Sequence, residues 1–523
     1  MIPKIAVRKF IEAPRDSYLP YKKFSPQKLR RLVSDLPVRP PIWKKLRRHQ
    51  KVCFLIGVHT HRYLFFCDTG MGKTCLSIAL TRYFRRAGLI SRVMVLVPNR
   101  SNTAEWSREI RKHSPKSTYT VLKGSSKKKW ELLRGEDSLF YIITYSGFSR
   151  MVCKLGPKKR GKEGDRLIPD PVKVKEIKSH VQGLFFDEST FIKNHRKLPY
   201  RILHKISKDM QIVFALTGMP FGRNPADLWA QFHAVDLGVT LGPTLGLFRA
   251  AFFKEEKNYW SKFKYSFEYT FIDEKIGQLR KMIENRSIYY EAEESDLPRV
   301  TRIKSVVRFP VDTYQYYEIA KQKLIAARGD YQEMKCAFTR MRQISSGFVG
   351  YWDDKDGRRA EFGFDDNPKL DKLLEIIESI SEKRKIIVFH EYIFSGSVIC
   401  RELEVQSIGY ARLWSGTKDP AEEMRRFDED PECWVFVVNN SAGAFGLNLQ
   451  VANYVIYYES PTSPIIRYQT ERRTIRSGQK RSRVFMYDLI MRNSYDRAIL
   501  QFHKRGADLL EAILKDPDKL LLH

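Results

Sequence analysis

The sequence predicts an α/β fold in which two doubly wound parallel sheets follow one another along the chain, with a helical region between them. Two series of short, continuous apolar runs alternate with helical stretches, and such runs are typical of strands covered by helices on both faces. A stretch with few strand-like runs separates the two series. The length of 523 residues leaves room for roughly two to four domains.

The first series predicts an α/β domain at residues 41–239. A helical stretch, residues 74–88, follows its first apolar run after a turn that contains glycine. Strands that alternate with helices predict a parallel sheet. The first 40 residues are basic and rich in proline, and we expect them to form an extension that packs on a later domain. The strand-like runs of this series are residues 62–67, 92–98, 139–145, 182–186 and 211–216.

The second series predicts another α/β domain at residues 367–523, ending in helices. Residues 240–366, between the two series, carry many aromatic and charged residues and are expected to form a mostly helical linker or protrusion. The strand-like runs of the second series are residues 385–390, 411–414, 434–439, 454–459 and 484–489.

The composition favours a polyanionic partner. The formal net charge is +33, and lysine and arginine bind phosphates by displacing counterions. Charge that serves only solubility, or that binds an acidic membrane surface, is the alternative. The sequence has no apolar run near the length of about 20 residues that spans a bilayer, and no secretory signal. We therefore expect a soluble, monomeric, intracellular protein, cytoplasmic in a prokaryote or phage and nuclear in a eukaryote.

The cysteines argue against a zinc module. There are seven, and none forms a CxxC pair. Their odd number and wide spacing are typical of reduced thiols.

A phosphate-binding loop follows the first strand-like run. Gly70 and Gly72 allow the backbone N–H groups to point at phosphates, and the helix that follows presents its positive end to the same anion. Lys73 can reach the β- and γ-phosphates of ATP, and Thr74 can ligate Mg²⁺. A glycine turn that merely begins a helix is the alternative, and Cys67 stands where such loops have their first glycine. The predicted loop is Asp68, Thr69, Gly70, Met71, Gly72, Lys73 and Thr74.

An acidic pair follows the run at residues 182–186. Asp187 and Glu188 stand where a parallel sheet faces the crevice beyond its strand ends. Asp187 would hold Mg²⁺, directly or through water, and Glu188 would orient and deprotonate the attacking water. The cap of a helix explains such a pair equally well when it stands alone. Together with the loop at Lys73, it predicts a site for ATP hydrolysis.

The order of these segments resembles that of the Swi/Snf class of superfamily-two helicase-like proteins. The resemblance covers roughly residues 41–515. Its motifs are Leu46–Gln50, where Gln50 would read the adenine edge; Asp68–Thr74; Val97-Pro98 with Trp106 and Glu109, on the nucleic-acid side; Asp187–Thr190 with Ile192–Asn194; Leu216–Pro220 with Asn224, Pro225, Leu228 and Trp229; Ser441–Leu449, which contains Gly446; and Gln469–Gln479, which aligns to Q-A-x-x-R-x-x-R-x-G-Q without gaps.

The resemblance implies two RecA-like sheets that bind ATP and Mg²⁺ between them. Gly446, Arg473 and Arg476 would come from the second sheet, and the two arginines would reach the γ-phosphate when the cleft closes. An arginine finger can contribute roughly 10³–10⁵ in rate, so hydrolysis would depend on closure. Nucleic acid bound across both domains would favour the closed state. The alternative for both arginines is a surface contact with phosphates or a solvated charge.

Four departures mark a divergent, compact member, of viral, phage or prokaryotic origin. Thr190 replaces a histidine and Met219 replaces a threonine, which puts the coupling of hydrolysis to movement in doubt. Thr462 replaces the tryptophan of W-N-P, so the grip on DNA is expected to differ, and Ala444 replaces a glycine.

Three functions remain open. The first is a DNA-stimulated ATPase that translocates on duplex DNA. The second is a helicase that separates strands, acting on DNA or, less readily, RNA; its wedge or stacking channel could be the aromatic-rich segment 259–265, for which a helical core stripe is the alternative. The third is a DNA-binding protein with weak catalysis.

Overall fold

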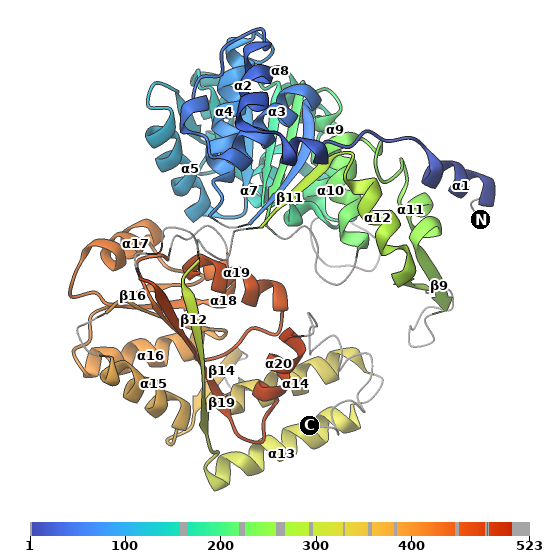
Figure 1. Cartoon of the computed structure of the whole chain (residues 1–523). Coiled ribbons are helices and arrows are strands. Elements are labelled where there is room, and N and C mark those ends of the chain that lie inside the picture. The colour runs from blue at the N-terminus through green and yellow to red at the C-terminus, as the bar shows by residue number, and fades with distance from the viewer. Residues whose placement is uncertain are drawn as a thin grey trace. The chain divides into compact units, whose positions relative to one another are not determined.

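The computed structural model describes residues 3–68, 70–156, 166–218, 225–257, 267–291, 297–327, 330–353, 358–380, 384–444, 449–475, 479 and 481–504. The chain divides into two compact units, residues 1–292 and 293–523, and each unit has its own parallel sheet (Figure 1). We describe each unit by itself.

The sheet of the first unit is seven-stranded, and all its strand pairs are parallel. The five strands predicted from the first series of apolar runs are confirmed, and β3 and β11 complete the sheet at its two edges. Because the strands are parallel, their carboxyl ends meet at one edge, where ligands bind in such sheets. The strand order is β11 (Ser287–Tyr290), β1 (Arg62–Cys67), β8 (Ile212–Thr217), β7 (Gly183–Asp187), β2 (Val93–Val97), β4 (Phe140–Thr144) and β3 (Tyr119–Val121).

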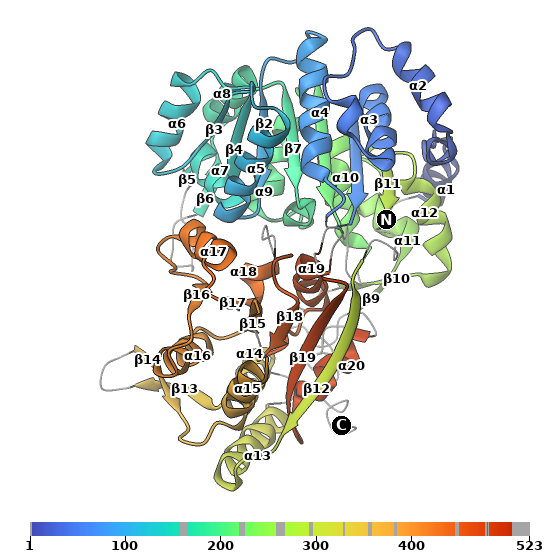
Figure 2. The same ribbon diagram turned by 60° about the vertical axis from the view of Figure 1, so that its left-hand side comes forward.

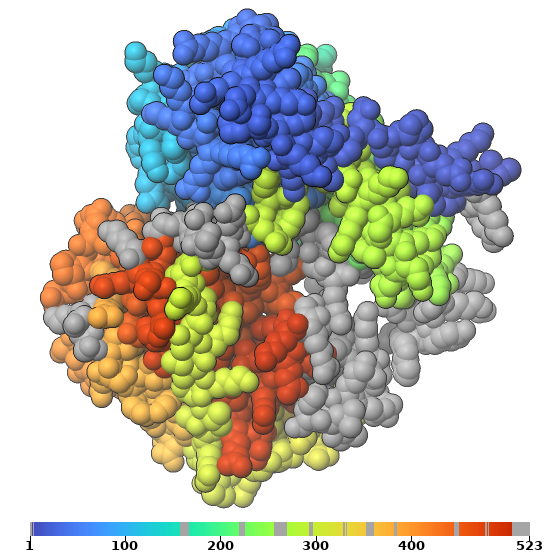
Figure 3. All heavy atoms as spheres, viewed as in Figure 1, coloured from blue at the N-terminus to red at the C-terminus, as the bar shows by residue number. Residues whose placement is uncertain are grey.

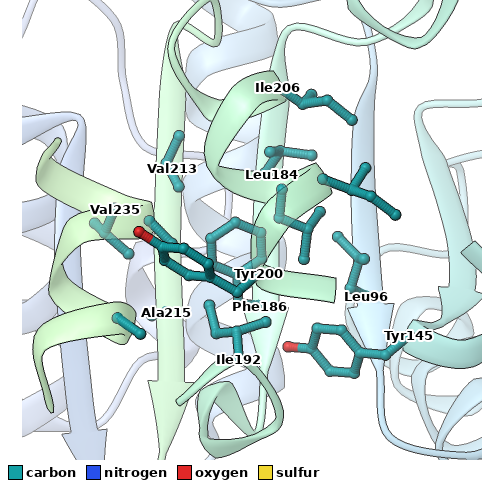
Figure 4. Packing of buried hydrophobic residues seen from close by; sticks show 14 of the residues in the cluster. Leu96, Tyr145, Leu184, Phe186, Ile192, Tyr200, Ile206, Val213, Ala215 and Val235 are labelled. Carbon is teal, nitrogen blue, oxygen red and sulfur yellow. The ribbon is translucent and has the colours of Figure 1, made fainter. Parts of the chain in front are cut away.

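Helices cover both faces of this sheet (Figure 2). Alternate strand residues point to opposite faces: Tyr63 and Phe65 pack with α3 and α4, whereas Leu64 and Phe66 pack on the other side. Figure 4 shows part of the core on that other side, where β7 and β8 pack against α9 and α10. The helices are α3 (Arg48–Thr60), α4 (Lys73–Arg86), α5 (Arg100–His113), α6 (Ser126–Gly135), α7 (Tyr145–Val152), α8 (Pro171–His180), α9 (Leu198–Ser207), α10 (Ala226–Asp236), α11 (Leu245–Phe252) and α12 (Ile276–Ile283).

The N-terminal segment contributes to both faces of the first unit. Phe10, in α1 (Lys4–Glu12), packs against the cluster on the α10 and α11 side. Leu29, in α2 (Pro26–Ser34), is buried in the cluster on the α3 side. Between the helices, Lys22 donates a hydrogen bond to the backbone oxygen of Tyr289 in the edge strand β11. Residues that showed no clear period in the sequence are therefore part of the core. Two 3₁₀ helices, Leu19–Lys23 and Trp43–Lys45, lie in the same segment.

The region 240–366 contains more strands than the sequence predicted. β11 joins the first sheet and β12 joins the second. Two antiparallel hairpins, β9 with β10 and β13 with β14, also lie here. These strands were missed because they are short or place charged residues among apolar ones, which hides the pattern of a buried strand. The hairpin strands are β9 (Phe253–Lys257), β10 (Phe267–Phe271), β13 (Phe348–Asp353) and β14 (Arg358–Gly363). A third hairpin, β5 (Cys153–Gly156) with β6 (Arg166–Pro169), lies in the first unit.

The sheet of the second unit is six-stranded and also parallel. All five predicted strands of the second series are confirmed. β12 pairs with β19 over nine residues, and Figure 3 shows these two distant parts of the sequence side by side on the surface of this unit. The order is β12 (Arg299–Val307), β19 (Arg483–Met491), β18 (Tyr454–Tyr457), β15 (Ile386–His390), β17 (Val435–Asn439) and β16 (Tyr410–Leu413).

Three of the helices of this unit, α13, α14 and α20, share a separate hydrophobic cluster. The others pack with the sheet. The helices are α13 (Val311–Ala326), α14 (Tyr331–Ser345), α15 (Pro368–Ser379), α16 (Ile393–Val405), α17 (Pro420–Glu429), α18 (Asn440–Ala444), α19 (Pro464–Thr474) and α20 (Tyr495–Lys504).

All seven cysteines are free thiols, as predicted. Among the described residues a membrane-spanning helix is absent, since none combines the required length with enough apolar character. No cluster of metal-binding side chains was found in the described part of the chain.

Candidate nucleotide-hydrolysis site

The loop between β1 and α4 has the backbone that a phosphate cradle requires. Gly70 and Gly72 have φ angles of 89° and 76°, in the left-handed region that favours glycine. Gly72 is the N-cap of α4, so the free N–H groups of the first helical turn begin at the loop. A Cβ atom at Gly72 would lie 2.3 Å from Nε2 of Gln50, so glycine is required there for space as well as for conformation.

Gln50 holds this loop in place. Its Nε2 donates to the backbone oxygens of Met71 and Gly72 at 3.2 and 3.0 Å, and its Oε1 accepts from the backbone N–H of Arg47 at 2.8 Å. His49 donates from Nε2 to the oxygen of Met71 at 2.8 Å. Both amide hydrogens of Gln50 are therefore used by the loop, while recognition of the adenine edge by Gln50 stays a prediction.

Lys73 begins α4, and its ammonium group stays close to the loop. Nζ donates to the backbone oxygen of Cys67, the last residue of β1, at 2.9 Å. The side chain therefore folds back over the turn that contains Gly70 and Gly72. Its positive charge acts on the carboxyl of Asp187, because it lowers the pKa of that group. The loop after β1 and the acidic pair after β7 thus lie at the same edge of the sheet.

Asp187 is the last residue of β7 and is almost completely buried. Its Oδ2 accepts a hydrogen bond from Nε1 of Trp106 at 2.8 Å, and its backbone oxygen accepts one from the hydroxyl of Tyr145 at 3.0 Å. Burial and the neighbouring Glu188 raise the pKa of Asp187 to about 7, although Trp106 and Lys73 oppose the shift. Such a carboxyl gains most from a nearby cation, as a Mg²⁺ ligand does.

Glu188 adopts a φ of 50°, an unusual backbone conformation for a residue with a side chain. Its carboxyl is buried, and Oε2 accepts from the hydroxyl of Thr217 at 3.1 Å. The next residue, Ser189, donates to Oε1 of Gln231 in α10 at 2.7 Å. The turn after β7 is thus fixed by β8 and α10, which holds the Glu188 carboxyl in one place.

The residues present fit Mg²⁺ and a triphosphate. The glycine cradle supplies N–H donors, Lys73 a cation, and Thr74 and Asp187 the oxygen ligands that Mg²⁺ prefers. Glu188 is a separate carboxylate beside them, and the neutral hydroxyl of Thr217 donates to it.

Sequence reasoning missed part of this site. Trp106 has a side chain that is 1% exposed and donates to Asp187, while the place of its motif on the nucleic-acid side stays a prediction. Thr217 and Tyr145 directly end or follow strands of the same sheet, so the rule that strand ends meet at one edge could have found them. Figure 4 shows Tyr145 in the core. Trp106 lies in the middle of α5, so no strand end marks it.

The predicted residues of the second sheet are only partly described. Arg473 lies in α19 and is buried. Three predicted site residues, Thr69, Gly446 and Arg476, lie outside the described residues, as does Met219. Of the other departures, Thr190 lies in a 3₁₀ helix (Ser189–Ile192) and the backbone oxygen of Thr462 accepts from His503 at 3.2 Å.

The aromatic-rich segment 259–265 also lies outside the described residues. The flanking strands β9 and β10 pair antiparallel, from Phe253 with Phe271 to Lys257 with Phe267.

Comparisons with known proteins agree with the motifs. A family model for the SNF2-related domain matches residues 48–345, and one for the helicase conserved C-terminal domain matches residues 368–478. The chain is 23% identical to Protein CHROMATIN REMODELING 5 of Arabidopsis thaliana, over 84% of this chain and 25% of that protein. It is 22% identical to SWI/SNF-related matrix-associated actin-dependent regulator of chromatin subfamily A-like protein 1 of Xenopus tropicalis, over 83% of this chain and 41% of that protein.

The chain thus spans a quarter to two fifths of the length of these relatives. Among solved structures, the Sulfolobus solfataricus SWI2/SNF2 ATPase core in complex with dsDNA is 20% identical, with a TM-score of 0.38, over 91% of this chain and 95% of that one. The SNF2-related match alone covers more than half of the chain, from α3 to α14. The chain belongs to the SNF2 family of helicase-like ATPases, with an SNF2-related domain followed by a helicase C-terminal domain.

Proposed function

We propose that this protein is an ATP-dependent motor that hydrolyses ATP when it binds nucleic acid and translocates along duplex DNA. Membership of the SNF2 family, the assembled site in the first unit and the net charge of +33 support this function. The observation that carries it is the placement of Asp187 and Glu188 beside the glycine loop and Lys73, at the carboxyl edge of one parallel sheet.

Each residue of the site has a separate task in this proposal. The N–H groups of the loop and the ammonium of Lys73 bind the phosphates, and Thr74 and Asp187 hold the ion. Bound Mg²⁺ would neutralise charge on the phosphates. Glu188 orients the attacking water and accepts its proton, and the hydroxyl of Thr217 keeps the Glu188 carboxyl in position.

The second unit would complete the site. We propose that Arg473 and Arg476 supply positive charge to the γ-phosphate, and that Gly446 contacts the nucleotide. Since an arginine finger contributes roughly 10³–10⁵ in rate, hydrolysis would be slow until nucleic acid favours the assembled state. Because hydrolysis would depend on the state that nucleic acid favours, repeated cycles of hydrolysis would move the protein along the nucleic acid.

The test is the rate of ATP hydrolysis in the presence of duplex DNA, single-stranded DNA and RNA, and without nucleic acid. We expect the largest stimulation with duplex DNA, and loss of turnover in Lys73→Ala and Glu188→Gln. Glu131→Gln, an exposed carboxyl in α6, is the control that should behave as wild type. Equal rates with and without nucleic acid would contradict the proposal. Binding should also weaken linearly with log salt, because phosphate contacts release counterions.

A strand-separating helicase is the second candidate. The antiparallel pairing of β9 with β10 favours it, because a hairpin is the kind of element that can divide two strands. A forked duplex with a fluorescent strand distinguishes the two. Release of the labelled strand during ATP turnover supports the helicase, whereas displacement of a bound triplex strand without duplex opening supports the translocase.

A further inference from the structure

The helix that carries Arg473 is attached to its sheet by a buried arginine. Arg467, in the first half of α19, has a side chain that is only 6% exposed. Its Nη1 and Nη2 donate to the two carboxylate oxygens of Asp488 in β19, at 2.5 and 3.2 Å, and its Nε donates to Oε1 of Glu471 at 2.7 Å. All three nitrogens of the guanidinium are therefore bonded to carboxylates.

Two further contacts fix the plane of this guanidinium. Nη1 of Arg467 also donates to the hydroxyl of Ser460 at 2.9 Å. The centre of the group lies 3.5 Å from the ring centroid of Tyr457, at the end of β18. A planar guanidinium that is stacked on a ring and bonded along two edges has very little freedom to rotate.

A second arginine reaches the same helix from the edge of the sheet. Arg302 in β12 donates from Nη1 and Nη2 to the two oxygens of Glu471, at 2.8 and 2.7 Å. Burial raises the pKa of the Glu471 carboxyl, but hydrogen bonds and charge from Arg302 and Arg467 lower it to about 2. Glu471 is thus a permanent carboxylate, and the chain Arg302, Glu471, Arg467 and Asp488 joins β12 to α19 and α19 to β19.

This arrangement specifies rotation as well as attachment. Apolar contacts permit a helix to turn or slide at small cost, whereas a bidentate ion pair is lost when its geometry changes. In α19, Glu471 precedes Arg473 by two residues, so a rotation that breaks the ion pairs would also redirect Arg473.

We infer that Arg467, Glu471, Asp488 and Arg302 are positioning residues that set the rotation of α19 and thereby aim Arg473 during ATP hydrolysis. They touch neither nucleotide nor nucleic acid in this role; they act through Arg473. The inference rests on the proposed function, because the action of Arg473 on ATP is part of that function.

Arg302→Ala is the decisive variant, because the Arg302 side chain is 52% exposed and its removal should leave the unit folded. Its matched control is Arg425→Ala: Arg425 in α17 is 57% exposed and makes an equally bidentate pair with Glu422, far in sequence from α19. For each we would measure kcat and KM for ATP with duplex DNA, the affinity for a fluorescent ADP, the affinity for ADP with aluminium fluoride, and the melting temperature.

We expect Arg302→Ala to lower kcat on the order of tenfold and to weaken binding of ADP with aluminium fluoride by a similar factor, while KM and ADP affinity stay within about twofold. Arg302→Lys should recover only part of the rate, since a lysine makes no bidentate pair. Arg425→Ala should match wild type. A purely structural role would change the melting temperature and not the ratio of the two affinities.

The buried pair gives a second test by charge exchange. Arg467→Asp and Asp488→Arg should each lose activity, and the double exchange should recover a clear part of the kcat lost in the single variants. If Arg302→Ala retains wild-type kcat, or the folded double variant stays as inactive as the singles, the inference is overturned. Should the Arg467 variants fail to fold, Arg302→Ala alone decides. An unstimulated wild type, by contrast, would refute the proposed function, and the inference would fall with it.

Discussion

Two carboxyls of this protein, the buried Asp187 in the first unit and the partly buried Glu471 in the second, have pKa values shifted in opposite directions. The pKa of Asp187 is raised to about 7, chiefly by burial, whereas that of Glu471 is lowered to about 2 by two arginines that overcome the effect of burial. Oδ2 of Asp187 accepts a hydrogen bond from the neutral indole of Trp106, and Glu471 receives charged donors from two sides. The different donors suit the two carboxyls to different tasks. A carboxyl held by a neutral donor can still gain much from a cation, as a metal ligand must, whereas one already paired can only hold structure.

The largest difference between the two carboxyls is expected when the charge of each is removed. Glu471→Gln should destabilise the second unit by about 3 kcal/mol, at the low end for a broken buried pair because Arg302 is 52% exposed. Asp187→Asn should leave stability equal or higher, because the amide oxygen can still accept from Trp106 and no longer faces the charge of Glu188. Urea unfolding of both variants is the measurement. Equal destabilisation would contradict the comparison.

A second test removes the indole N–H of Trp106, which is the neutral donor to Asp187. Trp106→Phe should cost about 1.5–3 kcal/mol, the range for a hydrogen bond to a charged group, and should raise the pKa of Asp187 further. The Mg²⁺ concentration that gives half-maximal hydrolysis should rise accordingly. Trp130→Phe is the control, because Trp130 is also buried but donates to the backbone oxygen of Met151 at 3.1 Å. A shift in Mg²⁺ requirement in both variants would mean that Trp106 has no special role.

The glycine loop gives a smaller effect that tests its geometry. Gly72 and Gly88 have nearly the same φ, 76° and 75°, so alanine should cost about 1–2 kcal/mol of backbone strain at either position. At Gly72 the added Cβ would also meet Gln50, whereas at Gly88 nothing lies within 4 Å. Fluorescent ADP should therefore bind more weakly to Gly72→Ala and normally to Gly88→Ala. Equal binding would show that the contact with Gln50 does not shape the loop.

Acid should weaken both units, so in this test the two units are expected to respond in the same direction. Burial lowers the pKa of His233 in the first unit and of His503 in the second to about 4. The folded state therefore favours the neutral imidazoles, so their contribution is present above pH 6.5 and is lost as the pH falls from 6.5 towards 4. Urea midpoints measured across this range should decrease. Less decrease in His233→Gln and His503→Gln would assign the loss to these residues.

The ten main strands, and the loop and acidic pair proposed as the site, could be predicted from the amino-acid pattern alone. Buried parallel strands must be continuous apolar runs, and phosphate binding needs glycine, lysine and a helix start at fixed spacing, so both are visible in one dimension. The same holds for the membership of a helicase-like family, which follows from the order of motifs. These features are local, and their physical causes act within a few residues.

The residues that support the site could be recognised only in the folded chain. Trp106 reaches Asp187 across 81 residues, and Arg302 reaches Glu471 across 169, so neither partner is marked by local spacing. The edge strands β11 and β12 were also hidden in the sequence, because their pairing with β1 and β19 defines them more than their own composition. A buried charged or polar group takes its meaning from the partner that satisfies it, and that partner is chosen by the packing of the whole unit.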